Sequence, residues 1–126
     1  MDEQVQRWLR YAESDLAAAN ILHQGGLYPQ ALFFLQQSIE KALKALILYR
    51  SRTVPPRIHS LPKLLKHCGL DVPRDQLLRL QDLTRYYAGS RYPEGLSEAP
   101  LEVSAEEVDR LSVFTEEFFA WLKQKL

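Results

Sequence analysis

Residues 29–49, PQALFFLQQSIEKALKALILY, decide the fold predicted for this chain, because as a helix they are apolar nearly all round. Apolar side chains cover more than half of the circumference. The remaining strip holds five polar residues: Gln36, Gln37, Glu40, Lys41 and Lys44. A helix with so little polar surface is buried on most sides. In a chain of 126 residues, this predicts a central place in a helical bundle, a subunit interface, or both.

The segments on either side also repeat apolar residues at helical spacing. Helices are predicted over residues 3–23, 29–49, 61–68 and 74–87, with a last helix beginning at Ser104. Gly25-Gly26 ends the first helix, and Ser104-x-x-Glu107 is a capping box. Nothing alternates with period two for long enough to form a strand. We therefore predict an all-α fold, an up-and-down bundle of four to five helices, as a single domain over residues 1–126.

Two connections interrupt the helices. Residues 51–58 contain Pro55-Pro56 and cannot continue a helix. Residues 88–103 contain two glycines and two prolines and show no periodicity. A loop of this length in a compact domain is often functional or mobile.

Composition places the chain among ordinary globular proteins, with 46% hydrophobic and 25% charged residues. Its single cysteine, Cys68, excludes an intramolecular disulfide and suits a reducing cytoplasm. The N-terminus is acidic and polar, unlike a signal peptide. The longest apolar stretch, residues 42–48, is interrupted by Lys44 and is too short to span a bilayer. We expect a cytoplasmic protein with no membrane association.

The formal net charge of zero hides a separation of charge along the chain. Residues 41–70 hold seven Lys or Arg, two His and no acid, whereas residues 94–117 hold eight acids and one base. Such separation indicates a site for an anion such as phosphate, a basic face for an acidic partner, or only an uneven solvated surface. The overall neutrality argues against a protein that binds duplex DNA.

The sequence contains no self-contained active site. It has no glycine-rich phosphate loop, no glycine-flanked serine nucleophile and no Cys-x-x-Cys. His67 and Cys68 are adjacent on a predicted helix and point in different directions, so a metal site there is not expected. We predict no metal and no cofactor.

Two groups of residues are candidates for binding. Gln37, Lys41 and Lys44 are spaced i, i+4, i+7 and emerge on one helix face, where they suit phosphate oxygens. The alternative is a routine i, i+4 surface bridge between Glu40 and Lys44.

The second group lies in residues 85–93, which combine two arginines with three tyrosines. Arg91 and Tyr92 suit a nucleotide, through bidentate phosphate contact and stacking. The alternative is that the tyrosines anchor the loop and Arg91 binds carbonyls at a helix end. His59 precedes the third helix, where a histidine more often caps or fixes a loop than catalyses.

Together these features resemble the HEPN domain family over almost the whole chain. The similarity is carried by five pieces in order: Trp8…Ala12-x-x-Asp15-Leu16, Gly26-x-Tyr28-x-x-Ala31-x-Phe33, Gln36-Gln37-x-x-Glu40-Lys41-Ala42-Leu43-Lys44-Ala45, His59-Ser60-Leu61-x-x-Leu64-Leu65, and Tyr87-x-x-x-Arg91-Tyr92-Pro93.

The resemblance implies a helical bundle that usually dimerises. It also implies a partner, since such proteins are often paired with a separate minimal nucleotidyltransferase, as its substrate-binding subunit or in a toxin–antitoxin couple. We therefore expect a non-catalytic protein that binds a nucleotide or another phosphate-bearing ligand. The expected nucleotide-binding residues are Gln37, Lys41, Lys44, His59, Arg91 and Tyr92.

A second branch of the same superfamily consists of RNA-cutting toxins, which carry an arginine followed after four to six residues by a histidine. Neither Arg85 nor Arg91 has such a histidine, and none follows His67. Arg52 and His59 fit by count, but they span the proline connection. Without an imidazole beside the arginine, RNA cleavage lacks its usual proton carrier. A ribonuclease with Arg91 as its catalytic arginine is therefore the alternative, and a purely structural dimerisation module is a third hypothesis.

Overall fold

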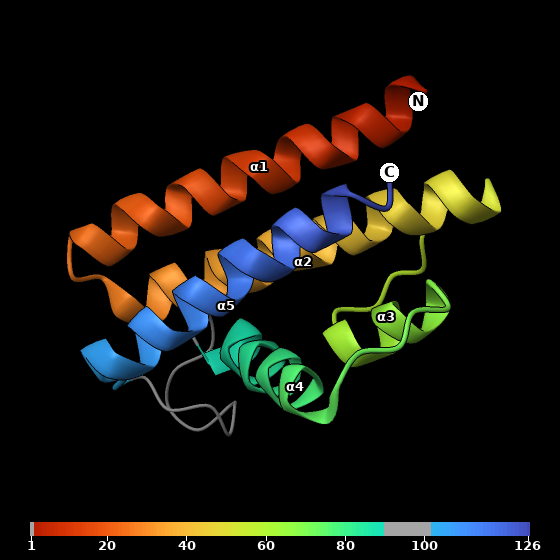
Figure 1. Ribbon diagram of the computed structural model, residues 1–126. Helices are drawn as coiled ribbons and strands as arrows, with labels where there is room; N and C mark the ends of the chain where they lie inside the picture. Colours follow the sequence, from red (N-terminus) through yellow and green to blue (C-terminus); the bar gives the residue numbers. More distant parts are fainter. Residues whose placement is uncertain (1, 90–101) are drawn as a thin grey trace.

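The computed structural model describes residues 2–89 and 102–126, and over these ranges it is built from helices alone (Figure 1). They are α1 (Glu3–Gln24), α2 (Tyr28–Ser51), α3 (Leu61–His67), α4 (Arg74–Gly89) and α5 (Ala105–Lys123). The predicted all-α class and the predicted number of helices are confirmed, with helix ends that differ by one or two residues. Among the described residues, no helix combines the length and apolarity that a membrane crossing requires.

Helix α2 lies at the centre and packs against each of the other four helices. Fourteen of its 24 residues are buried, so the packing within one chain already accounts for its apolar composition. The central position predicted for this helix is thus confirmed. The apolar composition of α2 by itself no longer calls for a second subunit.

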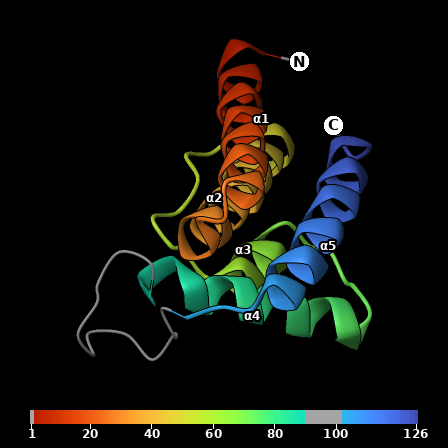
Figure 2. The ribbon, with the colours of Figure 1, turned by 90° about the vertical axis from the view of Figure 1, so that its left-hand side faces the viewer.

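Helices α1 and α2 form an antiparallel hairpin, and α5 runs along α2 beside them (Figure 1). Gly26 closes the hairpin with a φ of 76°, in the left-handed region that favours glycine. Behind it, the Leu27 N–H donates to the Leu22 carbonyl at 2.9 Å. In Figure 2, α4 crosses the three long helices instead of following them, and it carries the chain toward residues 90–101.

Helix α5 begins as predicted, because the Ser104 side chain accepts a hydrogen bond from the Glu107 N–H at 3.1 Å. Polar contacts then join α5 to α1. His23 Nε2 lies 2.6 Å from Asp109 Oδ1, and Lys123 Nζ lies 3.3 Å from Glu13 Oε2. His23 stands in the last turn of α1, so this contact joins the end of α1 to α5.

Candidate functional site

The polar residue at the centre of the site is Glu40, whose carboxylate is buried in the middle of α2 with 4% of the residue exposed. Helical spacing places one donor a turn before it and one a turn after it. The Gln36 amide donates to Glu40 Oε1 at 3.1 Å, and Lys44 Nζ lies 3.1 Å from Glu40 Oε2. A buried charge needs such partners, because desolvation would otherwise destabilise it strongly.

The two glutamines connect this carboxylate to the chain between α2 and α3. Gln36 is fully buried, and its Nε2 also donates to the carbonyl of His59 at 3.0 Å. Gln37 Nε2 in turn donates to Gln36 Oε1 at 2.7 Å. These bonds fix the backbone that carries His59, although Pro55-Pro56 prevent that segment from being helical.

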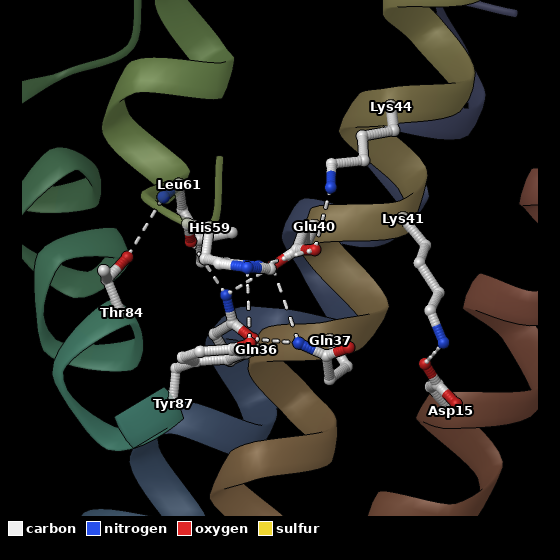
Figure 3. A network of polar contacts seen from close by, with 10 residues as sticks. All are labelled: Asp15, Gln36, Gln37, Glu40, Lys41, Lys44, His59, Leu61, Thr84 and Tyr87. Carbon is white, nitrogen blue, oxygen red and sulfur yellow. Dashed lines mark hydrogen bonds and ion pairs between the residues drawn. The ribbon is translucent and has the colours of Figure 1, made fainter. Parts of the chain in front are cut away.

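The imidazole of His59 faces Glu40 with Nδ1 and the Tyr87 hydroxyl with Nε2 (Figure 3). Its Nδ1 lies 3.1 and 3.2 Å from the two carboxylate oxygens of Glu40. Its side chain is 50% exposed, whereas that of Glu40 is 6% exposed. A buried carboxylate that holds Nδ1 in this way sets the tautomer and the orientation of the ring, and leaves Nε2 toward the outside.

Aromatic rings from α4 and α2 lie next to the His59 imidazole. Tyr87 stacks on His59 with ring centroids 4.5 Å apart and an interplanar angle of 17°, and its hydroxyl lies 3.4 Å from His59 Nε2. Phe33 stacks beside Tyr87 at 5.7 Å. Nearby, Thr84 Oγ1 accepts the Leu61 N–H at 3.1 Å, which joins the start of α3 to α4. We call Gln36, Gln37, Glu40, Lys44, His59 and Tyr87 the Glu40 network.

The structure divides the predicted strip on α2. Gln37 and Lys44 belong to the Glu40 network, but Lys41 turns toward α1, where its Nζ lies 2.5 Å from Asp15 Oδ2 (Figure 3). The ammonium groups of Lys41 and Lys44 each have a carboxylate partner, so they do not form a free pair of cations for phosphate. The predicted bridge between Glu40 and Lys44 exists, but it is buried and not on the surface.

The remaining two predicted residues, Arg91 and Tyr92, lie outside the described residues. In the sequence they follow Tyr87 by four and five positions. His59 also belongs to the predicted set, and its ring stacks on that of Tyr87. Of the predicted residues in the described ranges, Gln37, Lys44 and His59 therefore come together, and Lys41 does not.

Sequence reasoning did not single out three members of the site: Gln36, Glu40 and Tyr87. Glu40 was treated only as the partner of Lys44, although its place four residues after Gln36 also pointed to a shared contact. Tyr87 was considered only as one of the three tyrosines of residues 85–93, which were expected to stack on a nucleotide or to anchor the loop. No local signal could have paired it with His59, because 28 residues separate the two rings in the sequence.

No group of metal-ligating side chains gathers anywhere in the described ranges. The site instead offers an oriented imidazole, a half-buried amide and a stack of aromatic rings. Hydrogen bonding and stacking with a planar ligand are the interactions that this arrangement supports.

Comparisons with known proteins agree on one family. The family described as the HEPN domain matches residues 5–125. Among solved structures, TT1696 from Thermus thermophilus is 29% identical, with a TM-score of 0.82 over 99% of this chain and 100% of that one. ST0689, an archaeal HEPN homologue, is 30% identical, with a TM-score of 0.75 over 98% of each chain. No protein with a curated description matches the sequence.

Proposed function

The chain belongs to the HEPN domain family, and from this premise we propose that it binds a nucleotide or nucleotide-like substrate for a separate minimal nucleotidyltransferase. The observation that supports the proposal most directly is His59, a half-exposed imidazole fixed by a buried carboxylate and stacked on Tyr87. The proposal includes a cytoplasmic single-domain homodimer, and a toxin–antitoxin couple as one form of the pairing.

In this proposal, the ligand lies over the exposed side of His59. A planar base gains stacking energy against aromatic rings. A phosphate accepts a hydrogen bond from Nε2–H when the His59 ring is protonated, the form in which Nδ1–H also donates to Glu40. Lys41 and Lys44 position the site through Asp15 and Glu40 and do not contact the ligand. We assign any direct contact with phosphate to His59 and Arg91.

Calorimetric titration with ATP and with GTP tests this proposal. The unmodified protein should bind at least one of them, and His59→Ala should weaken that binding by about tenfold or more, the cost of a lost charge-assisted hydrogen bond. His67→Ala is the matched control, since His67 is an exposed histidine outside the Glu40 network. Absence of heat for both nucleotides, with and without a nucleotidyltransferase partner, would contradict the proposal.

One observation also favours a second function, that of a ribonuclease. The sequence lacks a histidine after Arg91, but the fold brings His59 from the connection before α3 to the last turns of α4. If Nδ1–H donates to Glu40, Nε2 of the neutral ring is a proton acceptor, as a general base requires. An imidazole is therefore present beside the helix that leads to Arg91.

Expression of the chain alone distinguishes these functions. A ribonuclease would arrest growth and cleave cellular RNA, and both His59→Ala and Arg91→Ala would relieve the arrest. A binding subunit would accumulate as a folded protein without harm. In that case His59→Ala should still weaken nucleotide binding in calorimetry, and the unmodified protein should cut no RNA.

A further inference from the structure

The basic segment, residues 41–70, also contributes a surface that lies outside the Glu40 network. Several exposed cations lie between the end of α2 and the end of α3: Arg50, Arg52, Arg57, Lys63 and Lys66. Within the described part of the chain, none of them forms an ion pair. Elsewhere in those ranges, some cations, such as Lys41 and Lys123, face a carboxylate, and others, such as Arg7 and Arg10, do not. The α3 region differs in that five such cations fall within residues 50–66.

Helix stability explains only some of these charges. Lys66 and His67 stand in the last turn of α3, where the helix dipole favours a cation. Arg50 donates from Nη1 to the Cys68 carbonyl at 2.9 Å and so satisfies the same helix end. Lys63 stands in the first turn, where the dipole disfavours a positive charge. The helix dipole therefore does not account for Lys63.

Lys63 and Lys66 line two neighbouring hollows. One, of about 490 Å³, is lined by Ile58, Lys63, Lys66 and His67. The other, of about 380 Å³, shares Lys63 and Lys66 and has mainly apolar walls: Pro62, Leu65, Leu70, Val72 and Leu77, with Asp71. Lys63 and Lys66 thus form a basic ridge with apolar surface on both sides. We call Arg50, Lys63, Lys66 and His67 the α3 basic surface.

We propose that the α3 basic surface binds an acidic amphipathic segment of a partner protein, which places carboxylates on the ridge and apolar side chains in the hollows. Charge complementarity requires an anionic partner, and the apolar walls require one with apolar side chains as well. A nucleic acid satisfies only the first requirement. A protein that binds its phosphate backbone through charge also typically neutralises about six to ten phosphates, more than this ridge supplies.

A second copy of the chain fits less well, although α5 carries many acids. Contact between the α3 region of one copy and the α5 region of the next would join unlike surfaces, and such contacts continue into filaments unless they close into a ring. The proposed surface shares no residue with the Glu40 network. The proposal therefore goes beyond the proposed function and does not depend on it.

Fluorescence anisotropy with a defined probe tests the proposal on the full chain. The probe is a labelled peptide of glutamate and leucine, about 18 residues or five helical turns long, with the leucines on one face. We expect saturable binding near physiological salt. Lys63→Glu with Lys66→Glu should weaken it by about tenfold or more, because two attractive contacts become repulsive.

Matched controls make the outcome specific. Arg7→Glu with Arg10→Glu changes the net charge equally, on exposed positions of α1, and should alter binding by less than about twofold. Far-ultraviolet circular dichroism verifies that both variants fold. Equal weakening by the two double variants would overturn the proposal, as would equal binding of a scrambled peptide that has no apolar face, or no binding of the probe.

Two further results would assign the surface to another partner and also overturn the proposal. One is tighter binding of an oligouridine than of the peptide, lost in the Lys63/Lys66 variant. The other is concentration-dependent self-association in sedimentation that the same variant abolishes. Binding of the amphipathic peptide alone, lost only in the Lys63/Lys66 variant, supports it.

Discussion

Glu40 is the residue whose replacement should affect this protein most. Glu40→Gln keeps the shape of the side chain but removes the charge that faces Lys44, whose side chain is 9% exposed. Breaking a buried ion pair by removal of one partner costs about 3–5 kcal/mol, because the other charge stays buried without compensation. We expect the lower end, about 3 kcal/mol, since the glutamine oxygen still accepts from Gln36. For a domain of this size that corresponds to a fall of about 10 °C in Tm.

The double variant Glu40→Leu with Lys44→Met should be far less destabilised than the sum of the single replacements. It removes both charges together, and buried ion pairs replaced by apolar groups of similar volume often lose little stability. The remaining cost is one unsatisfied N–H of Gln36, about 1–2 kcal/mol. His59 can exchange its bond to Glu40 for one to water because half of its side chain is exposed.

Urea unfolding followed by circular dichroism, on Glu40→Leu, Lys44→Met and the double variant, measures the coupling. Lys123→Ala is the control, because its partner Glu13 is about half exposed and such pairs contribute less than about 1 kcal/mol. A double variant that loses the full sum of the single effects would refute the reasoning. It would mean that the charges of Glu40 and Lys44 do not compensate each other.

Three further outcomes are expected. Burial raises the pKa of the Cys68 thiol from 9.0 to about 11, so only the unfolded chain ionises it between these values; the free energy of unfolding should fall across that range, and less steeply in Cys68→Ala. Ser104→Ala removes the cap of α5 and should cost about 1 kcal/mol by calorimetry, whereas an unchanged Tm would show that the cap contributes nothing. Leu43→Ala, at a fully buried position, should cost about 2–5 kcal/mol in urea unfolding, and a smaller loss would contradict the close packing around α2.

The fold followed from the sequence because helices are encoded locally. The apolar repeat of residues 29–49 and the Ser104 cap each act within a few residues of the chain. The central place of α2 was one of the alternatives, since a helix that is apolar nearly all round must be covered from several sides. The pattern of one helix does not show whether helices of the same chain or a second subunit bury it, because that depends on how the helices pack.

The candidate site was predicted less completely from the sequence, because its residues meet through packing between helices. Spacing on α2 correctly placed Gln37 and Lys44 near Glu40, because that relation is local. The same spacing grouped Lys41 with them, although Asp15 on α1 draws its ammonium to the other side. The meeting of His59 with Tyr87 joins a proline-containing connection to the end of α4, and no periodicity reports such a contact.

The roles assigned to four lysines change once the structure shows which of them pair with a carboxylate. In the sequence, Lys41 and Lys44 resemble phosphate ligands, and Lys63 and Lys66 belong to a basic segment that suits an anion, an acidic partner or only solvent. In the structure, the first two are held by Asp15 and Glu40, and a phosphate could take Lys44 only by leaving Glu40 buried with less compensation. The second two have no carboxylate partner among the described residues. Ligand contact is thus expected at His59, and partner contact at Lys63 and Lys66, so replacement of one set should leave the function of the other intact.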